Sequence, residues 1–588
     1  MRFPGKLLTV LSLAFASAAL LRAEPTAVGA EQPWHTFEAE TMRTNGVVLG
    51  PKYEPYLVET ESSGQRCVRL VRAKDFVEFN ATDAANALVL RFSLPDAAAG
   101  GGTSSELRLL VNGRAVQTLS LSSRYAWLYG KYPFTNTPAD GKPRNFYDEA
   151  SIRDLRIQSG DTIRLEFTGS GSPCIIDLVD LENVPPPLSR PAHSVSITDF
   201  ATGSHASNDS TEPLRKAIAS LQPKGGIVWI PAGEYRITGD IVVPSNVTLQ
   251  GAGLWHTRFV GDEVVYGDAS RRVRFKLSGT NIHLADFAIL GKLNYRNDTE
   301  PNDGIVGAGC AHSSIRRIWV EHTKIGAWIY NGTRLTIEGC RFRNTLADGV
   351  NLCVGTNHSV VENCTARGTG DDCFAIWPAP GDQGHAETAK PGHNVIRRCT
   401  GQLTSLANGG ALYGGESNRI EDCLFTDIGT GCGILISTTF PTSDSAQKID
   451  NNFSGTTMVE NCQLLRCGGF DHTWSYRGSI QICLDRKNIS GLVLKNLDVA
   501  QSLSDGITLI APGAAKGQGT LSDCRFEYVT ARDSGIGTTL NRAFFIRSDV
   551  AGSIVLENSE LNPTQNDSTQ FSVAGALASR QTLAPKSL

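Results

Sequence analysis

The chain has 588 residues and a formal net charge of −4, with 55 Lys and Arg against 59 Asp and Glu. This small negative balance disfavours nucleic acid and anionic membranes as partners, because the long-range field of the protein attracts neither. Hydrophobic residues make up 40% and charged residues 19%, which excludes a disordered chain, and the 59 glycines favour many tight turns over long helices. The composition therefore predicts a globular, all-β protein.

Residues 1–23 have the layout of an export signal. Arg2 and Lys6 precede an apolar run over 7–21, and the small residue Ala23 follows this run. The run is shorter than the roughly 20 residues that span a bilayer. We therefore expect cleavage of this segment and a secreted or periplasmic protein.

Three segments are predicted after the signal. Residues 31–184 alternate apolar and polar positions in short runs, with a hairpin signature at Asn112 and Gly113, and predict a β-sandwich. Residues 185–194 are rich in proline and predict an extended linker, because proline cannot continue a strand ladder. Residues 195–588 show short β runs with turns rich in glycine and asparagine, which predicts a parallel β-helix.

A repeated β run that ends in cysteine supports the β-helix. The unit is about 24 residues long, with two insertions, and no helical pattern lies inside it. Its cysteines are Cys340, Cys364, Cys399, Cys423 and Cys462. Since they should form one column, two states are open: a ladder of buried thiols, or disulfides between neighbouring coils.

A short helix is predicted at the start of the β-helix. Residues 209–213 carry a cap residue, an early acid and an early proline, and Leu214, Ile218 and Leu221 form one apolar face. We expect this helix to cover the open end of the core. Residues 225–235 then resemble the first coil of pectin-lyase-like right-handed β-helix proteins, a resemblance that implies fold alone.

Three aspartates are the candidate catalytic residues. Asp348 and Asp372 differ by one repeat and should lie on adjacent coils, while Asp371 should point another way. Glycoside hydrolysis needs one protonated carboxyl and one carboxylate, and stacked carboxylates supply both because like charges raise a pKa. We expect Asp371 to be the general acid and the other two to hold water. The alternative is that these aspartates are ordinary turn residues.

The segments around these aspartates resemble glycoside hydrolase family 87, the α-1,3-glucanases and mycodextranases. The resemblance lies in residues 347–377, 406–415 and 431–436, and it implies an inverting endo-hydrolase whose three catalytic aspartates are the three named above. The Gly-Asp-Asp-Cys element is also similar to the polygalacturonases of family 28. No Gly-His-Gly and no Arg-x-Lys, the elements that suit a uronate substrate, follow this element in the sequence.

Two insertions, residues 378–392 and 438–452, are predicted to form the walls of a substrate cleft, because both follow equivalent strands. Aromatic side chains between them can offer flat faces to sugar rings, although aromatics beside strands also serve as core residues. The residues expected to bind substrate are Trp377, Asn408, Tyr413 and Phe440.

The N-terminal domain resembles carbohydrate-binding modules of families 6 and 35, through Phe-Glu-Ala-Glu at residues 37–40 and Ile-Asp-Leu-Val-Asp at residues 176–180. The resemblance implies a structural calcium ion held by Glu38, Glu40 and Asp180, and oxygen ligands suit this hard ion. We expect no cofactor for catalysis.

The leading hypothesis is a secreted, monomeric hydrolase with α-glucan polysaccharide as its partner. One alternative is a polygalacturonase-like hydrolase or a polysaccharide lyase on the same fold. A second alternative is a non-catalytic carbohydrate-binding surface protein, in which the aspartates only shape turns.

Overall fold

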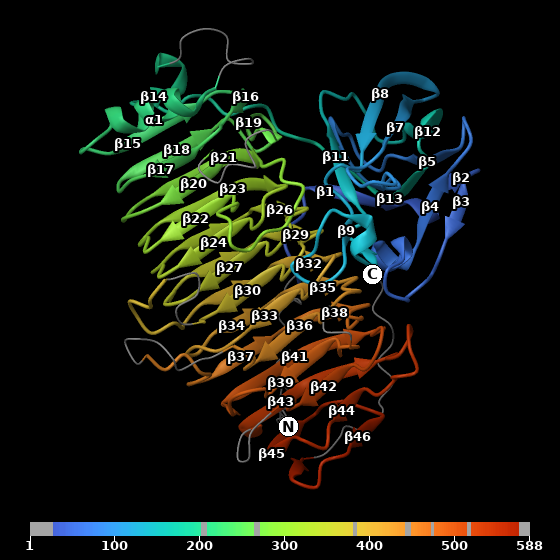
Figure 1. Ribbon diagram of the computed structural model, residues 1–588, viewed down its shortest axis with the longest axis vertical. Helices are drawn as coiled ribbons and strands as arrows, with labels where there is room; N and C mark the ends of the chain where they lie inside the picture. Colours follow the sequence, from blue (N-terminus) through green and yellow to red (C-terminus); the bar gives the residue numbers. More distant parts are fainter. Residues whose placement is uncertain are drawn as a thin grey trace, which may run out of the picture.

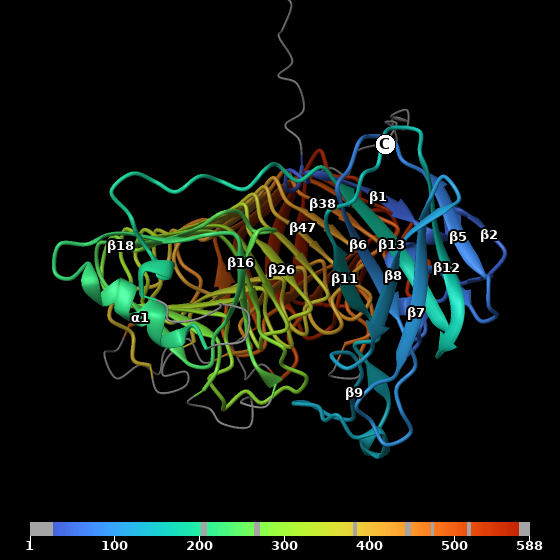
Figure 2. The same cartoon turned by 90° about the horizontal axis from the view of Figure 1, so that it is seen from above.

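The computed structural model describes residues 28–200, 209–263, 271–379, 385–440, 449–471, 475–513 and 519–575. In Figure 1 an elongated β-helix runs from green coils at the top to red coils at the bottom, and a blue and cyan domain lies beside its upper coils. The view from above in Figure 2 also places the two domains side by side. The predicted signal, residues 1–23, lies outside the described residues. Among the residues that are described, no helix is long and apolar enough to cross a membrane.

The N-terminal domain is the predicted β-sandwich. One sheet has six strands, in the order β11-β6-β13-β4-β3 with β1 on β13, and the other has five, in the order β2-β5-β12-β7-β8. Asn112 and Gly113 connect β7 to β8 with φ angles of 51° and 74°, which suits a tight hairpin turn. The strands are β1 (Trp34–Glu38), β2 (Arg43–Thr44), β3 (Val47–Leu49), β4 (Cys67–Leu70), β5 (Phe76–Asn80), β6 (Ala87–Ser93), β7 (Ser104–Val111), β8 (Arg114–Ser122), β9 (Leu128–Tyr129), β10 (Pro143–Arg144), β11 (Asp148–Ile152), β12 (Thr162–Gly171) and β13 (Cys174–Glu182).

The second domain is the predicted right-handed parallel β-helix. Its coils stack strand on strand, so that Ile329, Leu352, Ile376, Leu412 and Ile436 are neighbours in register, and all five are buried. Burying one such side chain contributes about 1.5–3 kcal/mol, and the same gain recurs on each coil. One sheet of 12 strands contains this row. Its strands are β17 (Asp240–Val243), β20 (Arg274–Leu277), β22 (Ile305–Ala308), β24 (Ala327–Tyr330), β27 (Val350–Cys353), β30 (Phe374–Trp377), β33 (Gly410–Leu412), β36 (Ile434–Ser437), β39 (Ile480–Cys483), β42 (Ile507–Ile510), β44 (Phe544–Ile546) and β46 (Thr564–Asn566).

The remaining faces of the coils form one connected sheet of 22 strands. Its strands are β14 (Val195–Ser196), β15 (Gly226–Ile230), β16 (Gly233–Arg236), β18 (Val247–Gly251), β19 (Thr257–Val260), β21 (His283–Leu290), β23 (Ser314–Glu321), β25 (Thr336–Glu338), β26 (Arg341–Arg343), β28 (Val360–Glu362), β29 (Thr365–Arg367), β31 (Val395–Arg397), β32 (Thr400–Gln402), β34 (Arg419–Glu421), β35 (Leu424–Thr426), β37 (Thr457–Glu460), β38 (Gln463–Leu465), β40 (Ile489–Ser490), β41 (Leu492–Ala500), β43 (Thr520–Arg532), β45 (Ala551–Glu557) and β47 (Phe571–Ala574).

The helix α1 (Thr211–Ser220) covers the N-terminal end of the β-helix, as predicted. Leu214 and Ile218 are buried in the main core, and Leu221 packs against it. The Asp209 side chain accepts the backbone N–H of Thr211 at 2.9 Å and so caps the first turn.

All fourteen cysteines are buried free thiols, so the alternative of disulfides between neighbouring coils is wrong. The predicted column is a ladder: the backbone N–H of Cys340 donates to Cys364 Sγ at 3.4 Å, and that of Cys399 donates to Cys423 Sγ at 3.5 Å. Outside this ladder, burial raises the pKa of the Cys373 and Cys467 thiols to about 12, so these two thiols are protonated at neutral pH.

Buried ion pairs join the two domains. Arg341 of the β-helix binds both carboxylate oxygens of Glu182, at 2.7 and 2.8 Å. Arg367 binds Glu149 at 2.5 Å and Asp180 at 2.7 Å. Because removing one partner of a buried pair leaves an uncompensated charge, these contacts fix the orientation of the sandwich on the β-helix.

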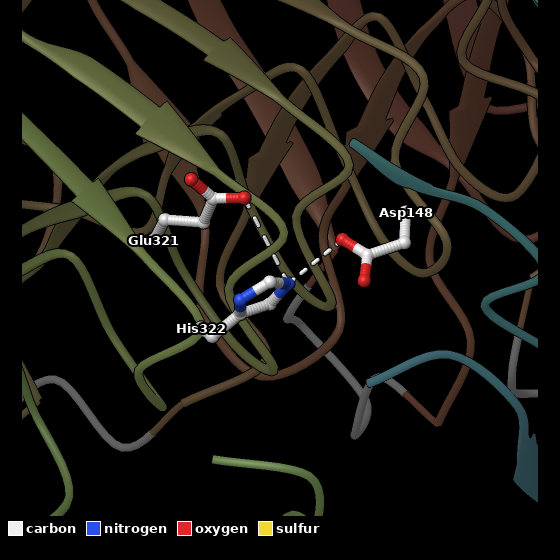
Figure 3. A group of neighbouring side chains, drawn as sticks. All are labelled: Asp148, Glu321 and His322. Atoms are coloured by element: carbon white, nitrogen blue, oxygen red, sulfur yellow. Dashed lines mark hydrogen bonds and ion pairs between the residues drawn. The ribbon is translucent and has the colours of Figure 1, made fainter. Parts of the chain in front are cut away.

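A fourth contact of this kind is drawn in Figure 3, where His322 of the β-helix lies between Asp148 of the sandwich and Glu321. His322 Nε2 is 2.8 Å from Asp148 Oδ1, to which the Asn344 side chain also donates, at 3.2 Å. The imidazole stacks on Tyr125, with ring centroids 4.3 Å apart. Burial alone would lower the pKa of His322, but the neighbouring acids raise it to about 9, so His322 carries a positive charge at neutral pH.

Candidate active site

The three aspartates meet at the start of two adjacent strands. Asp348 precedes β27 and Asp372 precedes β30, and the ladder pairs Val350 with Phe374, so the predicted stacking on neighbouring coils is confirmed. One carboxylate oxygen from each of the two, together with one from Asp371, lies within 4.8 Å of the others. The Asp371 side chain is 26% exposed, whereas the other two are buried.

Asp372 is held by three donors. The Asn408 backbone N–H and side-chain amide donate to its Oδ1 at 3.1 and 2.7 Å, and the Tyr413 hydroxyl donates to its Oδ2 at 2.9 Å. Burial, and next the charge of Asp371, raise the pKa of Asp372 to about 7, although the three donors lower it. Asn408 and Tyr413, which we expected to contact sugar, thus support a carboxylate of the triad.

Asp348 has fewer donors. Its one side-chain contact among the described hydrogen bonds is the Asn351 amide, at 3.4 Å. Burial, followed by the charges of Asp371 and Asp372, raises the pKa of Asp348 well above its ordinary value. Because the pKa values of both Asp348 and Asp372 are raised, this pair of carboxyls retains a proton near neutral pH.

An arginine contacts the third aspartate. Arg296 Nη2 donates to Asp371 Oδ2 at 2.7 Å, and the guanidinium is buried. Burial lowers the pKa of Arg296, but the charges of Asp371 and Asp298 outweigh it and hold the pKa above its ordinary value. Sequence reasoning missed this residue because it comes from the segment between β21 and β22, which has no repeat relation to the aspartates.

The outer face of the 12-stranded sheet carries aromatic rings beside the triad. The ring of Phe440 packs edge-on against Trp377 and against Tyr413, with centroids 5.0 and 5.2 Å away. Trp328 packs edge-on against Trp377 from the other side, at 5.6 Å. Trp377 and Phe440 are partly exposed, whereas Tyr413 is only 9% exposed and packs between its neighbours.

The same face contains buried polar atoms that have no hydrogen-bond partner among the described residues. They are Nε1 of Trp328, Nε1 of Trp377, Oδ1 of Asn351 and Nε2 of Gln481. Trp328 pairs with Asn351 in the ladder, and both alternate with inward-facing core residues, so both point outward. An orphaned buried polar atom costs about 1–3 kcal/mol, and sugar hydroxyls can satisfy such donors and acceptors. The pattern of the sequence did not single out Trp328 or Gln481.

The two insertions predicted as cleft walls contact each other. The Asn451 side chain of the second insertion donates to Glu387 Oε1 of the first at 2.8 Å, and both residues are buried. Residues 380–384 and 441–448 of these insertions lie outside the described part of the chain.

The three residues predicted to hold calcium do not meet. The Oε2 atoms of Glu38 and Glu40 are buried and have no hydrogen-bond partner in the part of the chain that the structure describes, which fits an oxygen-ligated cation. Burial, followed by the charge of Asp177, raises the pKa of Glu38 to about 8. Asp180 instead accepts hydrogen bonds from Thr36 and from Arg367 of the β-helix. Asp177 lies near the two glutamates, and its charge raises the pKa of both, but its Oδ2 accepts a hydrogen bond from the buried guanidinium of Arg91.

Comparison with solved structures supports the same architecture. The catalytic unit of a thermostable α-1,3-glucanase from Streptomyces thermodiastaticus is 27% identical, with a TM-score of 0.78 over 94% of this chain and 98% of that one. The catalytic domain of Agl-KA is 23% identical and shares the fold, with a TM-score of 0.82 over 95% of this chain and 100% of that one.

Curated relatives match only part of the chain. The pre-neck appendage protein of Bacillus phage B103 is 25% identical over 187 residues, which are 30% of this chain and 20% of that protein. The chain thus spans about a fifth of the length of this relative.

Two family models together match most of the chain. The model described as "Alpha-1,3-glucanase catalytic domain D1" matches residues 31–184, and "Alpha-1,3-glucanase catalytic domain D2" matches residues 206–562. Between them they include the sandwich, the triad and most of the β-helix. This decides against a non-catalytic surface protein. The chain belongs to the family of α-1,3-glucanase catalytic domains, glycoside hydrolase family 87, and is a glycoside hydrolase.

Proposed function

We propose that the protein hydrolyses α-1,3-glucosidic linkages in α-glucan, within the chain and with inversion at the anomeric carbon. The observation that carries the proposal is the triad of Asp348, Asp371 and Asp372, with oxygen atoms within 4.8 Å of one another beside an aromatic face. A catalytic domain of a family 87 α-1,3-glucanase, 24% identical to this chain, has been solved in complex with nigerose. The substrate named there and the family support the same linkage for this protein.

Each aspartate has a role in the proposal. Asp371 has the most exposed side chain of the three and donates its proton to the glycosidic oxygen. Arg296 stabilises the carboxylate that Asp371 becomes after this transfer. Asp348 and Asp372 hold the attacking water and accept its proton. The oxygens of the triad lie closer together than the roughly 6.5–9.5 Å usual for inverting pairs, so inversion is inferred from the resemblance to family 87 and not from this spacing.

Substrate would lie along the outer face of the 12-stranded sheet. Trp377 and Phe440 offer apolar ring surface to the sugar, and the unpaired atoms of Trp328, Asn351 and Gln481 bind its hydroxyls. Asn408 and Tyr413 orient the Asp372 carboxylate by hydrogen bonds and so affect the reaction without contacting the sugar.

The test is hydrolysis of a polymer panel containing α-1,3-glucan, nigeran, dextran and polygalacturonate. New reducing ends from an α-1,3-linked glucan, lost by a factor of about 10³ in Asp371→Asn, are the expected result. Proton NMR of the first product then reports its anomeric configuration: initial β-anomer indicates inversion. Release from polygalacturonate alone, or unsaturated products that absorb ultraviolet light, would replace the proposal with a pectic hydrolase or a lyase.

We also propose a structural calcium ion in the sandwich, with Glu38 and Glu40 as ligands; Asp177 and Asp180 instead accept hydrogen bonds from Arg91 and Arg367. The orphaned Oε2 atoms of the two glutamates support it. Calcium would supply charge neutralisation in this buried acidic site and take no part in the hydrolysis.

We further propose that the protein is secreted and is a monomer. It is supported by the signal-like composition of residues 1–23 and by an extracellular polymer as substrate. Comparing the N-terminal residue and the elution volume of protein recovered from the medium would test both parts.

A further inference from the structure

Arg296 connects the triad to a part of the chain outside the β-helix. Its Nε donates to Asp298 Oδ1 at 2.9 Å, and its Nη1 donates to the backbone oxygens of Leu346 and Gly370 at 3.2 and 2.8 Å. Its Nη2 donates to Asp371 at 2.7 Å. The guanidinium is therefore oriented on several sides at once, and its direction toward the aspartate is fixed by these partners.

Tyr132 of the sandwich provides a further partner. Its ring lies against the guanidinium, with Cζ of Arg296 4.7 Å from the ring centroid. Its hydroxyl donates to Asp298 Oδ2 and accepts a hydrogen bond from Arg296 Nη2 at 3.2 Å. One tyrosine from the other domain thus holds both members of the Arg296–Asp298 pair.

The loop that carries Tyr132 is anchored to the β-helix. It connects β9 with β10, and Phe134 within it is 5% exposed and belongs to the main β-helix core, as does Leu128 at its base. The Asn136 side chain donates to the backbone oxygen of Asn294, two residues before Arg296. These contacts therefore fix the position of the loop, and with it the position of Tyr132.

We propose that the sandwich completes the active site, and that Tyr132 is a positioning residue that holds Arg296 in its contact with Asp371. The inference rests on the proposed function, because it assigns a role within the same reaction. When Asp371 gives up its proton, the negative charge that forms lies 2.7 Å from a guanidinium already in place. Without the tyrosine hydroxyl, Arg296 and Asp298 lose a shared partner, and the guanidinium must be reoriented during the reaction.

The effect on pH dependence follows from the charges nearby. The charged and titratable groups around Arg296 are Asp298, Asp371, Asp348, Tyr132 and, through Asp298, Lys324. A well-placed guanidinium favours the ionised form of the triad. When the guanidinium of Arg296 is held less firmly, the triad should lose its proton at a higher pH, and the fall of kcat/KM on the alkaline side should move to higher pH.

The experiment compares wild type with Tyr132→Phe in the full chain, on a soluble α-1,3-linked gluco-oligosaccharide. Phe keeps the ring against the guanidinium and removes only the hydroxyl. We expect kcat to fall about tenfold with KM within about twofold, together with the alkaline shift. The matched control is Tyr129→Phe, which removes a tyrosine hydrogen bond to Asp96 at 2.7 Å in the same domain and should leave kcat and the pH profile unchanged.

A second variant, Asp298→Asn, weakens the orientation of Arg296 from the β-helix side and should lower kcat in the same way. Tm and the folded fraction are measured for each variant. Wild-type kinetics in Tyr132→Phe would overturn the inference, as would a fall in kcat that only follows the loss of folded protein in both variants. If the wild type releases no sugar from any α-1,3-linked substrate, the proposed function fails instead.

Discussion

The hydroxyl of Tyr413 donates to Asp372 Oδ2 over 2.9 Å, from the end of one coil to the start of the coil before it. This bond lowers the pKa of Asp372 against the effect of burial. In Tyr413→Phe we expect the pKa of Asp372 to rise above about 7 and kcat to fall about tenfold, because one oxygen that holds the water loses its orientation. Steady-state kinetics from pH 4 to 9 measure both effects. Tyr235→Phe, which removes a hydroxyl that donates to the Pro231 carbonyl at 3.1 Å far from the triad, is the control.

The pH profile of the wild type is a second prediction. Asp372 has a raised pKa of about 7 and Asp348 a pKa well above its ordinary value, so the triad holds a proton below neutral pH and loses it as the pH rises. Because the proposal makes Asp372 a base, which acts in its ionised form, we expect kcat/KM to rise as the pH rises through about 7. A profile that shows no such rise between pH 5 and pH 9, measured on a soluble oligosaccharide with the enzyme stable throughout, would contradict this role of Asp372.

The repeat made half of this site predictable. Because coils of the β-helix stack in register, a separation of one repeat was enough to place Asp348 and Asp372 together. Arg296 and Tyr132 come from a segment between strands and from another domain, where no period relates them to the triad. Their contacts depend on how the two domains pack, which a local pattern does not encode.

The calcium ligand predicted at Asp180 has a similar cause. Asp180 accepts a hydrogen bond from Arg367 of the β-helix, whereas Asp177 accepts from the Ser63 N–H and from Arg91 within the sandwich. The partner of Asp180 belongs to the other domain, so a pattern along β13 alone carries no signal for it.

The His322–Asp148 contact between the domains should make stability depend on pH. The folded pKa of His322, about 9, lies above its ordinary value of 6.5, so its contribution is complete below that ordinary value and is lost as the pH rises through 9. Burial raises the pKa of Glu321 to about 7, so the ionisation of Glu321 above this pH also lowers the stability of the folded state as the pH rises. We expect the Tm difference between wild type and His322→Gln to be large at pH 6 and small above pH 9.

Thermal unfolding across this range checks the interdomain prediction, with His283→Gln as the control. His283 lies on β21, and burial lowers its pKa, so its variant should not share this dependence. If the Tm difference between wild type and His322→Gln is constant from pH 6 to 10, the charge on the imidazole does not stabilise the contact with Asp148.

The acidic site in the sandwich leads to the last prediction. Burial, and next the charge of Asp177, raise the pKa of Glu38 to about 8, so without a cation this carboxyl is largely protonated at neutral pH. A bound Ca²⁺ must displace that proton, and its affinity should therefore increase as the pH rises toward 8. We expect added Ca²⁺ to raise Tm and a chelator to lower it, with a larger effect at pH 8 than at pH 6. Glu38→Gln should abolish the response, whereas Glu31→Gln, on the exposed surface of the same domain, should retain it. If neither Ca²⁺ nor a chelator changes Tm at pH 8, the calcium proposal is wrong, and Glu38 and Glu40 are buried neutral acids.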